Sequence, residues 1–424
     1  MQTGSSHSAG RFCARGLKAV STLLVLGAAL SAQPIQAAPF AYVTSIFSQD
    51  AVNVIDTANN TLADTISVGS LPTGLAVSPD GTRVYVGISD SKTVVVIDTA
   101  SNEMVDPPIV MASAPNNIAV APDGKHVYVT HGNADFVSVI DTTRNAVTST
   151  IIVGNGGQRI AVTPDGKHIY VTNGSPTVSV IDLAANAVTA TITMGSGALG
   201  IVMARDGKRA YLICGSDLCA IDTASNTVSP TIALRNGPPA PSPTGLAVAP
   251  DGKRVYVVDG ATDSVLIVDT ATGTLLPTVP AGDHLNDMAI AADGRHVYVT
   301  SGGHPGAVSV IDTYTNSMVA TVPIADVPGA AVEIAMAPPP LGPFAYVTNR
   351  GDDTVSAIDT RTQRLVNTVM LPTGSKPTGI AVTPDGEYVY VADTGTSPGI
   401  VSVVKSRPTM TPSGTECIAL IMLG

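Results

Sequence analysis

A tyrosine-centred unit of 41 to 48 residues recurs along most of this 424-residue chain, and it limits the possible folds more than any other feature. The tyrosine opens one short apolar run, and an aspartate closes the next run in step with it. The nine tyrosines are Tyr42, Tyr85, Tyr128, Tyr170, Tyr211, Tyr256, Tyr298, Tyr346 and Tyr390. Repeats of this length built from β-type runs are typical of β-propellers, in which each repeat forms one blade. Helical repeats are excluded, because the runs are rich in Val, Ile and Thr and lack a 3.6-residue apolar spacing.

Residues 160–194 show how one unit is organised, as four short runs separated by turn residues. Pro164-Asp165-Gly166 predicts a hairpin between the first two runs, because proline presets the first turn residue and glycine accepts a positive φ. The run Ile160–Val162 is entirely apolar, whereas apolar residues alternate with threonine in Val188–Thr193. That alternation predicts a half-solvated edge strand. We therefore predict an all-β fold of four-stranded antiparallel blades, with the first strand innermost and the fourth outermost.

The number of blades depends on where the repeats begin and end. Eight copies of the unit run from Phe40 to Gly386, and a partial ninth copy runs from Tyr388 to Val404. Eight blades is the preferred prediction, with one blade assembled from both ends of the chain. The proline run Pro338–Pro340 replaces a Pro-Asp-Gly turn, which leaves the alternative of seven blades plus an extra C-terminal hairpin unit.

The second-strand motifs resemble a known repeat family. Tyr170-Val171-Thr172-Asn173 follows a Pro-Asp-Gly turn and precedes Val-Ser-Val-Ile-Asp, and Tyr-Val-Thr-Asn recurs at residues 346–349. This pattern is similar to the YVTN-family β-propeller repeat, and the resemblance covers residues 40–404. It implies the propeller fold. The functions that it implies range from surface-layer and envelope proteins to ligand-binding scaffolds.

The two ends of the chain match no repeat. Residues 1–37 have basic residues, then an apolar run of 13 residues at 19–31, then small residues near Ala37, which predicts a signal peptide. So short a run cannot span a bilayer, so we expect an exported periplasmic or extracellular protein without integral membrane association. Residues 38–405 are predicted to form a single propeller domain. Residues 406–424 are predicted to be an unstructured tail, and no role is assigned to its apolar run Cys417–Leu423.

Two cysteines stand close together within one unit. Cys214 and Cys219 flank Gly215-Ser216-Asp217-Leu218, which we interpret as a four-residue hairpin loop. In an oxidising compartment such a loop brings two cysteines within bridging distance, which predicts a disulfide. Two reduced core cysteines remain the alternative. A zinc site is not predicted, because no further Cys or His stands nearby to complete a tetrahedral set.

The charge of the chain argues against polyanionic partners. Cleavage after residue 37 removes three basic residues and no acidic one, which changes the formal net charge from −11 to −14. An acidic surface does not attract nucleic-acid phosphates or anionic membranes. By this criterion nucleic acid is not the expected partner. We expect an unidentified protein or small molecule of the cell envelope instead.

One position just before the innermost strand differs between the repeats. In chain order it holds Gly74, Asn117, Arg159, Gly200, Gly245, Asp287, Glu333 and Gly379. Glycine meets any backbone requirement there, so structure alone does not explain the polar side chains. Because these loops surround the mouth of the central channel, we predict a ligand-binding site formed by Asn117, Arg159, Asp287 and Glu333, with His284 from the same loop as Asp287. The alternative is that these are solvated loop residues without a common role.

Three functions fit these observations. The leading prediction is a non-enzymatic binding scaffold of the cell envelope without a cofactor, because no catalytic motif is present. The alternative is a metal-assisted hydrolase resembling the propeller lactonases, in which Asn117, Asp287 and Glu333 would hold Ca²⁺ or another divalent cation. A second alternative is single-stranded DNA binding, which the YVTN resemblance suggests and the negative net charge of the chain argues against.

His126, His168 and His296 occupy the same position of the hairpin turn in their repeats as Arg209 and Arg254 do in theirs, and we call this position the turn column. Because arginine also occurs there, the histidines are predicted to face solvent.

Overall fold

The computed structural model describes residues 51–56, 61–69, 72–101, 103–234, 241–291, 293–325, 331–336, 344–370, 376–382, 388–393 and 402–405. The chain divides into two units, Met1–Gln36 and Ala37–Gly424, and every described residue belongs to the second. The regular elements of the described ranges are all strands, and no helix long and apolar enough to cross a membrane occurs among them. The predicted signal peptide and C-terminal tail lie outside the described residues.

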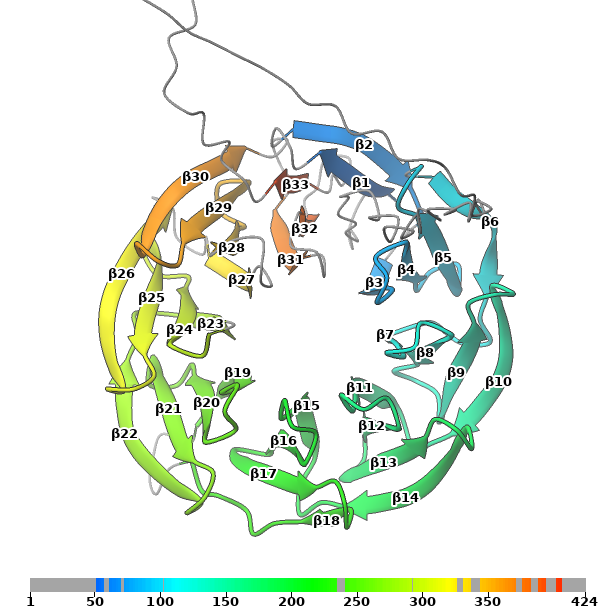
Figure 1. Ribbon diagram of the computed structural model, residues 1–424, viewed down its shortest axis with the longest axis horizontal. Coiled ribbons are helices and arrows are strands. Elements are labelled where there is room, and N and C mark those ends of the chain that lie inside the picture. The colour runs from blue at the N-terminus through cyan, green and yellow to red at the C-terminus, as the bar shows by residue number, and fades with distance from the viewer. Residues whose placement is uncertain are drawn as a thin grey trace, which may run out of the picture. The chain divides into compact units, whose positions relative to one another are not determined.

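Seven sheets contain four strands each (Figure 1). The first three comprise β3 (Pro72–Val77), β4 (Arg83–Ile88), β5 (Thr93–Asp98) and β6 (Glu103–Val110); β7 (Asn117–Val120), β8 (His126–Thr130), β9 (Phe136–Asp141) and β10 (Ala146–Ile152); and β11 (Gly157–Val162), β12 (His168–Asn173), β13 (Thr177–Asp182) and β14 (Ala187–Thr193). The next two comprise β15 (Ala198–Met203), β16 (Arg209–Cys214), β17 (Asp217–Asp222) and β18 (Thr227–Val228); and β19 (Pro243–Val248), β20 (Arg254–Asp259), β21 (Ser264–Asp269) and β22 (Thr274–Pro280).

The remaining strands complete the described part of the ring. The last two four-stranded sheets comprise β23 (Leu285–Ile290), β24 (His296–Ser301), β25 (Gly306–Asp312) and β26 (Ser317–Ala325); and β27 (Ala331–Met336), β28 (Phe344–Asn349), β29 (Thr354–Asp359) and β30 (Arg364–Met370). Two smaller sheets comprise β31 (Pro377–Val382), β32 (Tyr388–Asp393) and β33 (Ser402–Lys405); and β1 (Ala51–Asp56) and β2 (Thr61–Ser67).

The sheets form a propeller. Strands pair antiparallel in chain order within each sheet, and the first strand of each four-stranded sheet contacts the first strand of the next, from β3 to β31 (Figure 1). β33 lies beside β1, so the two smaller sheets meet between the last and first complete sheets. The predicted all-β propeller of four-stranded antiparallel blades is confirmed, with seven complete blades and an eighth ring position to which both ends of the propeller contribute strands.

Burial is greatest in the two middle strands of a blade. In the blade β11–β14, four consecutive residues of β13 are buried, whereas β14 alternates between exposed and partly buried side chains up to Ile192. A strand buried on both faces needs a continuous apolar run, and an outer strand needs apolar residues on one face only. The predicted position of the fourth strand at the outer edge is confirmed.

The hydrophobic core lies between neighbouring blades. Tyr170 packs with Leu212 of the following blade, and Tyr298 packs with Val347 of its following blade. Each hydroxyl reaches across the same junction: Tyr298 donates to the carbonyl oxygen of Thr360 at 3.2 Å, and Tyr170 donates to Oδ1 of Asn226 at 2.7 Å. The recurring tyrosine therefore packs across the junction between blades, and at Tyr170 and Tyr298 it also bonds across it.

Several side chains of the turn column also join blades. Arg209 donates from Nη1 to the carbonyl oxygen of Thr270 at 3.1 Å, Arg254 donates to the carbonyl oxygen of Thr313, and His296 Nε2 lies 3.2 Å from Gln363 Nε2. Arg209 is exposed and the other members of the column are partly buried, so the column meets solvent and three of its side chains also bond to the next blade. The sequence could not reveal these bonds, because the partners lie about 60 residues later, in the next blade.

Candidate functional site

The four polar residues of the predicted site occupy equivalent places on four innermost strands. In each case the backbone N–H donates to the hydroxyl oxygen of a threonine in the neighbouring second strand. The pairs are Asn117–Thr130 at 3.1 Å, Arg159–Thr172 at 3.1 Å, Asp287–Thr300 at 2.9 Å and Glu333–Thr348 at 3.0 Å. In three of these innermost strands the pairing register with the second strand shifts at the polar residue. The threonine hydroxyl therefore accepts the backbone N–H that would otherwise bond to a carbonyl of the neighbouring strand.

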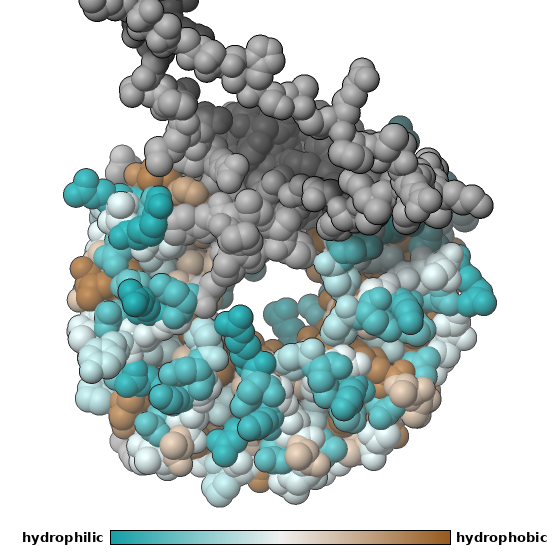
Figure 2. Space-filling model, viewed as in Figure 1, coloured by the Kyte–Doolittle hydropathy of each residue, from teal (hydrophilic) through white to brown (hydrophobic). Residues whose placement is uncertain are grey.

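A cavity of about 510 Å³ lies along four consecutive innermost strands, β11, β15, β19 and β23. Arg159 and Asp287 are the charged residues in its lining, and they come from the first and the last of these strands. Gly200 and Gly245 line it between them. A Cβ atom added at Gly200 would meet no heavy atom within 4 Å, so the space in front of β15 is open. Figure 2 shows hydrophilic residues around the central opening of the propeller.

The carboxyl group of Asp287 is held against the wall of this cavity. Its Oδ2 accepts the N–H of Ile334 at 3.2 Å, and a Cβ atom added at Gly245 would lie 3.6 Å from its Oδ1. Burial raises the pKa of this carboxyl, and the backbone N–H groups of Met288 and Ile334 act in the opposite direction. An acid whose ionised form is disfavoured by burial is a common feature of binding and catalytic sites.

Comparison with known proteins finds similarity to β-propeller families. The model of the YNCE-like β-propeller family matches residues 26–209, and that of the seven-bladed lactonase β-propeller family matches residues 246–409. Each model matches less than half of the chain, and the two matches together are consistent with a β-propeller of the YVTN type.

Named relatives agree with this assignment. The seven-bladed β-propeller protein Rv1057 of Mycobacterium tuberculosis is 26% identical over 226 residues, which cover 46% of this chain and 54% of Rv1057. YncE of Salmonella typhi is 27% identical over 154 residues, which cover 35% of this chain and 41% of YncE. The chain thus spans about half the length of the curated relatives that it matches. The solved structure of dihydro-heme d1 dehydrogenase NirN aligns with a TM-score of 0.66 at 16% identity, over 82% of this chain and 75% of that chain, which shows the fold alone.

Within this propeller, only some of the predicted site residues come together. Arg159 and Asp287 line one cavity, and Asn117, His284 and Glu333 are absent from its lining. Asn117 begins β7, whose ring neighbours are β3 and β11, so it is far around the ring from β23 and β27. His284 is exposed with φ of 55°, and its N–H donates to Asp263 Oδ1 at 2.8 Å.

The proposed cation ligands are also separated. Glu333 follows Asp287 around the ring on the adjacent strand, but Asn117 is on the other side of Arg159. Among the described residues, no three His, Cys, Asp or Glu side chains are grouped closely enough to hold a metal ion. Calcium binding by Asn117, Asp287 and Glu333 stays a prediction, and it would require ligands from opposite sides of the channel.

A further signal of the site was present in the sequence. Threonine is found in the second strand of every repeat with a polar residue at the varying position, and an apolar residue or glycine replaces it wherever that position is glycine. The replacements are Gly87, Ile213, Val258 and Ala392. Ile213 lines the cavity, so the glycine repeats leave room there and add an aliphatic side chain to its lining. Comparing the position before the innermost strand with this second-strand position in every repeat would have identified the cavity region from the sequence.

A second set of buried polar residues supports the loops that lead to the innermost strands. Asn173 Nδ2 donates to Ser179 Oγ at 3.1 Å, and Asn349 Nδ2 donates to Ser356 Oγ at 2.8 Å. His131 takes the place of the asparagine in its blade: its Nε2 lies 2.9 Å from Ser138 Oγ and its Nδ1 lies 3.0 Å from the carbonyl oxygen of Ala114. Because a carbonyl only accepts, Nδ1 carries the proton and Nε2 accepts from the serine.

Acidification is expected to destabilise the protein through His131. Burial lowers the pKa of this imidazole, and the carbonyl groups of Ala114 and Ser113 partly oppose the effect. Between the unfolded-state pKa of about 6.5 and the lower folded-state pKa, the unfolded chain binds more protons. The free energy of unfolding should therefore fall as the pH drops below about 6.5. Urea unfolding midpoints measured over this range should show less acid loss for His131→Asn than for wild type or the exposed-site control His304→Asn. Equal slopes in all three would contradict the prediction.

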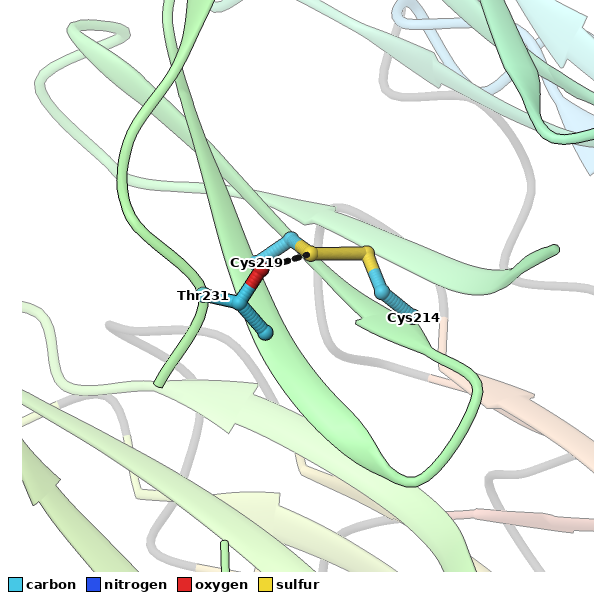
Figure 3. The surroundings of a disulfide bond; sticks show 3 residues. All are labelled: Cys214, Cys219 and Thr231. Carbon is cyan, nitrogen blue, oxygen red and sulfur yellow. Dashed lines mark hydrogen bonds between the residues drawn. A yellow bond between two sulfur atoms is a disulfide. The ribbon is translucent and has the colours of Figure 1, made fainter. Parts of the chain in front are cut away.

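A disulfide replaces the Asn–Ser hydrogen bond in the blade β15–β18. Cys214 and Cys219 are bonded, with Cα atoms 5.9 Å apart, and both are buried (Figure 3). The turn between them is shorter than the predicted four-residue loop: only Gly215 and Ser216 are unpaired, and β17 already begins at Asp217. The two cysteines are thus diagonal neighbours on one face of the sheet, because Cys214 pairs with Asp217 and Leu212 pairs with Cys219.

Removing this bridge should have a modest effect. The double variant Cys214→Ala/Cys219→Ala is expected to lose about 2 kcal/mol of unfolding free energy, the loop-entropy value for so short a loop. Cys214→Asn/Cys219→Ser restores the pair found in other blades and should recover about 1 kcal/mol of that loss. Chemical denaturation with and without reductant measures both. A wild-type midpoint that does not respond to reductant would show that the bridge contributes no stability.

Proposed function

We propose that this protein is an exported β-propeller that binds a small ligand at the mouth of its central channel and does not transform it. The observation that carries the proposal is the cavity along β11, β15, β19 and β23, with Arg159 and Asp287 in its lining. Concave sites with an apolar lining and a few polar groups are the usual form of ligand sites. Residues 1–37 support export by their signal-peptide pattern, and the Cys214–Cys219 bridge suits an oxidising compartment.

The test fills the cavity without disturbing its neighbours. Gly200→Leu places a side chain in the open space in front of β15, where an added Cβ meets no atom within 4 Å. Gly195→Leu is the matched control, because Gly195 is equally open but does not line the cavity. A fragment library screened by ligand-observed NMR should yield compounds that bind wild type and Gly195→Leu but not Gly200→Leu. Binding that survives in Gly200→Leu would overturn the proposal.

Hydrolysis is a second candidate, favoured by the match of residues 246–409 to the lactonase propeller family. The separation of Asn117 from Asp287 and Glu333 weighs against it, so we derive no metal-dependent step. Stoichiometric divalent metal in the purified protein, together with lactone turnover that Asp287→Asn abolishes, would establish this candidate over simple binding. Single-stranded DNA binding has less support, because turn lysines such as Lys167 have an aspartate close by, here Asp165 at 3.8 Å.

A further inference from the structure

The cavity along β11, β15, β19 and β23 carries opposite charges at its two ends. Arg159 lies on the first of the four strands and Asp287 on the last. Among the described residues, neither the guanidinium of Arg159 nor the carboxylate of Asp287 forms an ion pair with another side chain. Asp287 is partly buried and Arg159 is exposed, and a ligand that carries both a positive and a negative group can pair with each of them.

The surface between these charges combines aliphatic side chains with uncovered backbone. Ile201, Ile213 and Leu246 line the cavity there, and Gly200 and Gly245 leave the backbone uncovered. Contact with aliphatic side chains favours a ligand whose middle section is apolar, because its burial removes hydrocarbon from water. Isoleucine at residue 213 stands where blades with a polar residue have threonine, so this blade adds an aliphatic side chain to the lining.

The spacing of the charges limits the length of the ligand. The Asp287 carboxylate lies close to Gly245 of β19, and β15 lies between β19 and the β11 strand that carries Arg159. Paired strands are spaced by roughly 5 Å, so a ligand that reaches from one side of β15 to the other must be longer than the ammonium-to-carboxylate span of a single amino acid. Three extended residues span up to about 10 Å, which suits it better.

We propose that the ligand is a short apolar peptide with free termini, whose carboxylate pairs with Arg159 and whose ammonium group pairs with Asp287. This inference rests on the proposed ligand-binding function and specifies its ligand. The ammonium group requires an ionised Asp287. Because burial raises the pKa of that carboxyl, binding should weaken as the pH falls through the raised value.

Trileucine and its two end-blocked forms test the proposal by isothermal titration calorimetry at mildly alkaline pH. Wild type should bind trileucine, and N-acetylation or C-terminal amidation should each weaken binding at least about tenfold, as expected for the loss of one charge-assisted contact. In Asp287→Asn the acetylated and free peptides should bind equally, and in Arg159→Gln the amidated and free peptides should. Arg205→Gln, which removes an arginine from a different cavity, should behave as wild type.

The outcomes separate this inference from the proposed function. No binding of trileucine, or equal affinity for all three peptides in wild type, would overturn the peptide assignment. If fragments still bind in a Gly200-dependent manner, the binding function stands without it. If no compound binds in a Gly200-dependent manner, both proposals fall. Circular dichroism of each variant shows whether the fold is retained.

Discussion

Replacing Tyr298 with alanine is expected to lower the free energy of unfolding by about 4 kcal/mol, the usual cost of removing a buried aromatic ring. The ring is fully buried among side chains of its own blade and of the next, including Val308, Ile334 and Val347. The vacancy would therefore open at a junction between two sheets, and both would lose contacts. Because rigid strands surround the site, collapse to fill the vacancy should be limited.

Two further variants separate the contributions to this effect. Tyr298→Phe keeps the ring and loses only the hydrogen bond to Thr360, so it should cost about 1 kcal/mol. Tyr314→Ala is the control for a tyrosine that fills no core, because its side chain is 89% exposed, and it should change stability by less than about 0.5 kcal/mol. Urea denaturation measures all three. A loss of unfolding free energy below about 1 kcal/mol in Tyr298→Ala would show that the recurring tyrosines do not hold the blades together.

Asp259→Ala is the second change expected to have a large effect, a loss of about 3 kcal/mol. Asp259 is fully buried, and its carboxylate accepts the N–H of Ser242 at 2.9 Å, the N–H of Ala261 at 3.0 Å and the hydroxyl of Thr262 at 2.6 Å. Alanine would leave these donors without their acceptor. The bond to Ser242 matters for function as well, because Ser242 immediately precedes β19, whose residues line the cavity.

Asp259→Asn tests the role of charge at the same position. Its amide oxygen can accept from the two N–H groups and its amide nitrogen can donate to Thr262, so the loss should be about 1 kcal/mol. Hydrogen exchange should show faster exchange at residues 241–246 in the alanine variant and near wild-type exchange in the asparagine variant. Unchanged exchange in Asp259→Ala would mean that this carboxylate does not hold the loop before β19.

The order of the strands could be predicted because it depends on local chemistry. The Pro-Asp-Gly turn at residues 164–166 forms as expected: Gly166 has φ of 67°, and Asp165 Oδ1 accepts the N–H of Lys167 at 3.1 Å. Turn formation and period-2 alternation involve residues a few positions apart. The same pattern recurs in eight copies of the unit and in a partial ninth. The repeats also allowed equivalent positions to be compared, and that comparison identified Arg159 and Asp287 as candidate site residues.

Only the tertiary structure showed which of these residues line the same cavity. The comparison of equivalent positions did not distinguish Arg159 and Asp287 from Asn117 and Glu333. The distances between these side chains across the ring depend on how the blades pack. The open space at Gly200 could not be predicted from the sequence either, because a glycine leaves a cavity only if no neighbouring side chain fills the space. Arg209 likewise meets Thr270 only across a blade junction. The sequence by itself determined the blades, because hairpins are local, and the packing of one blade on the next determined the site.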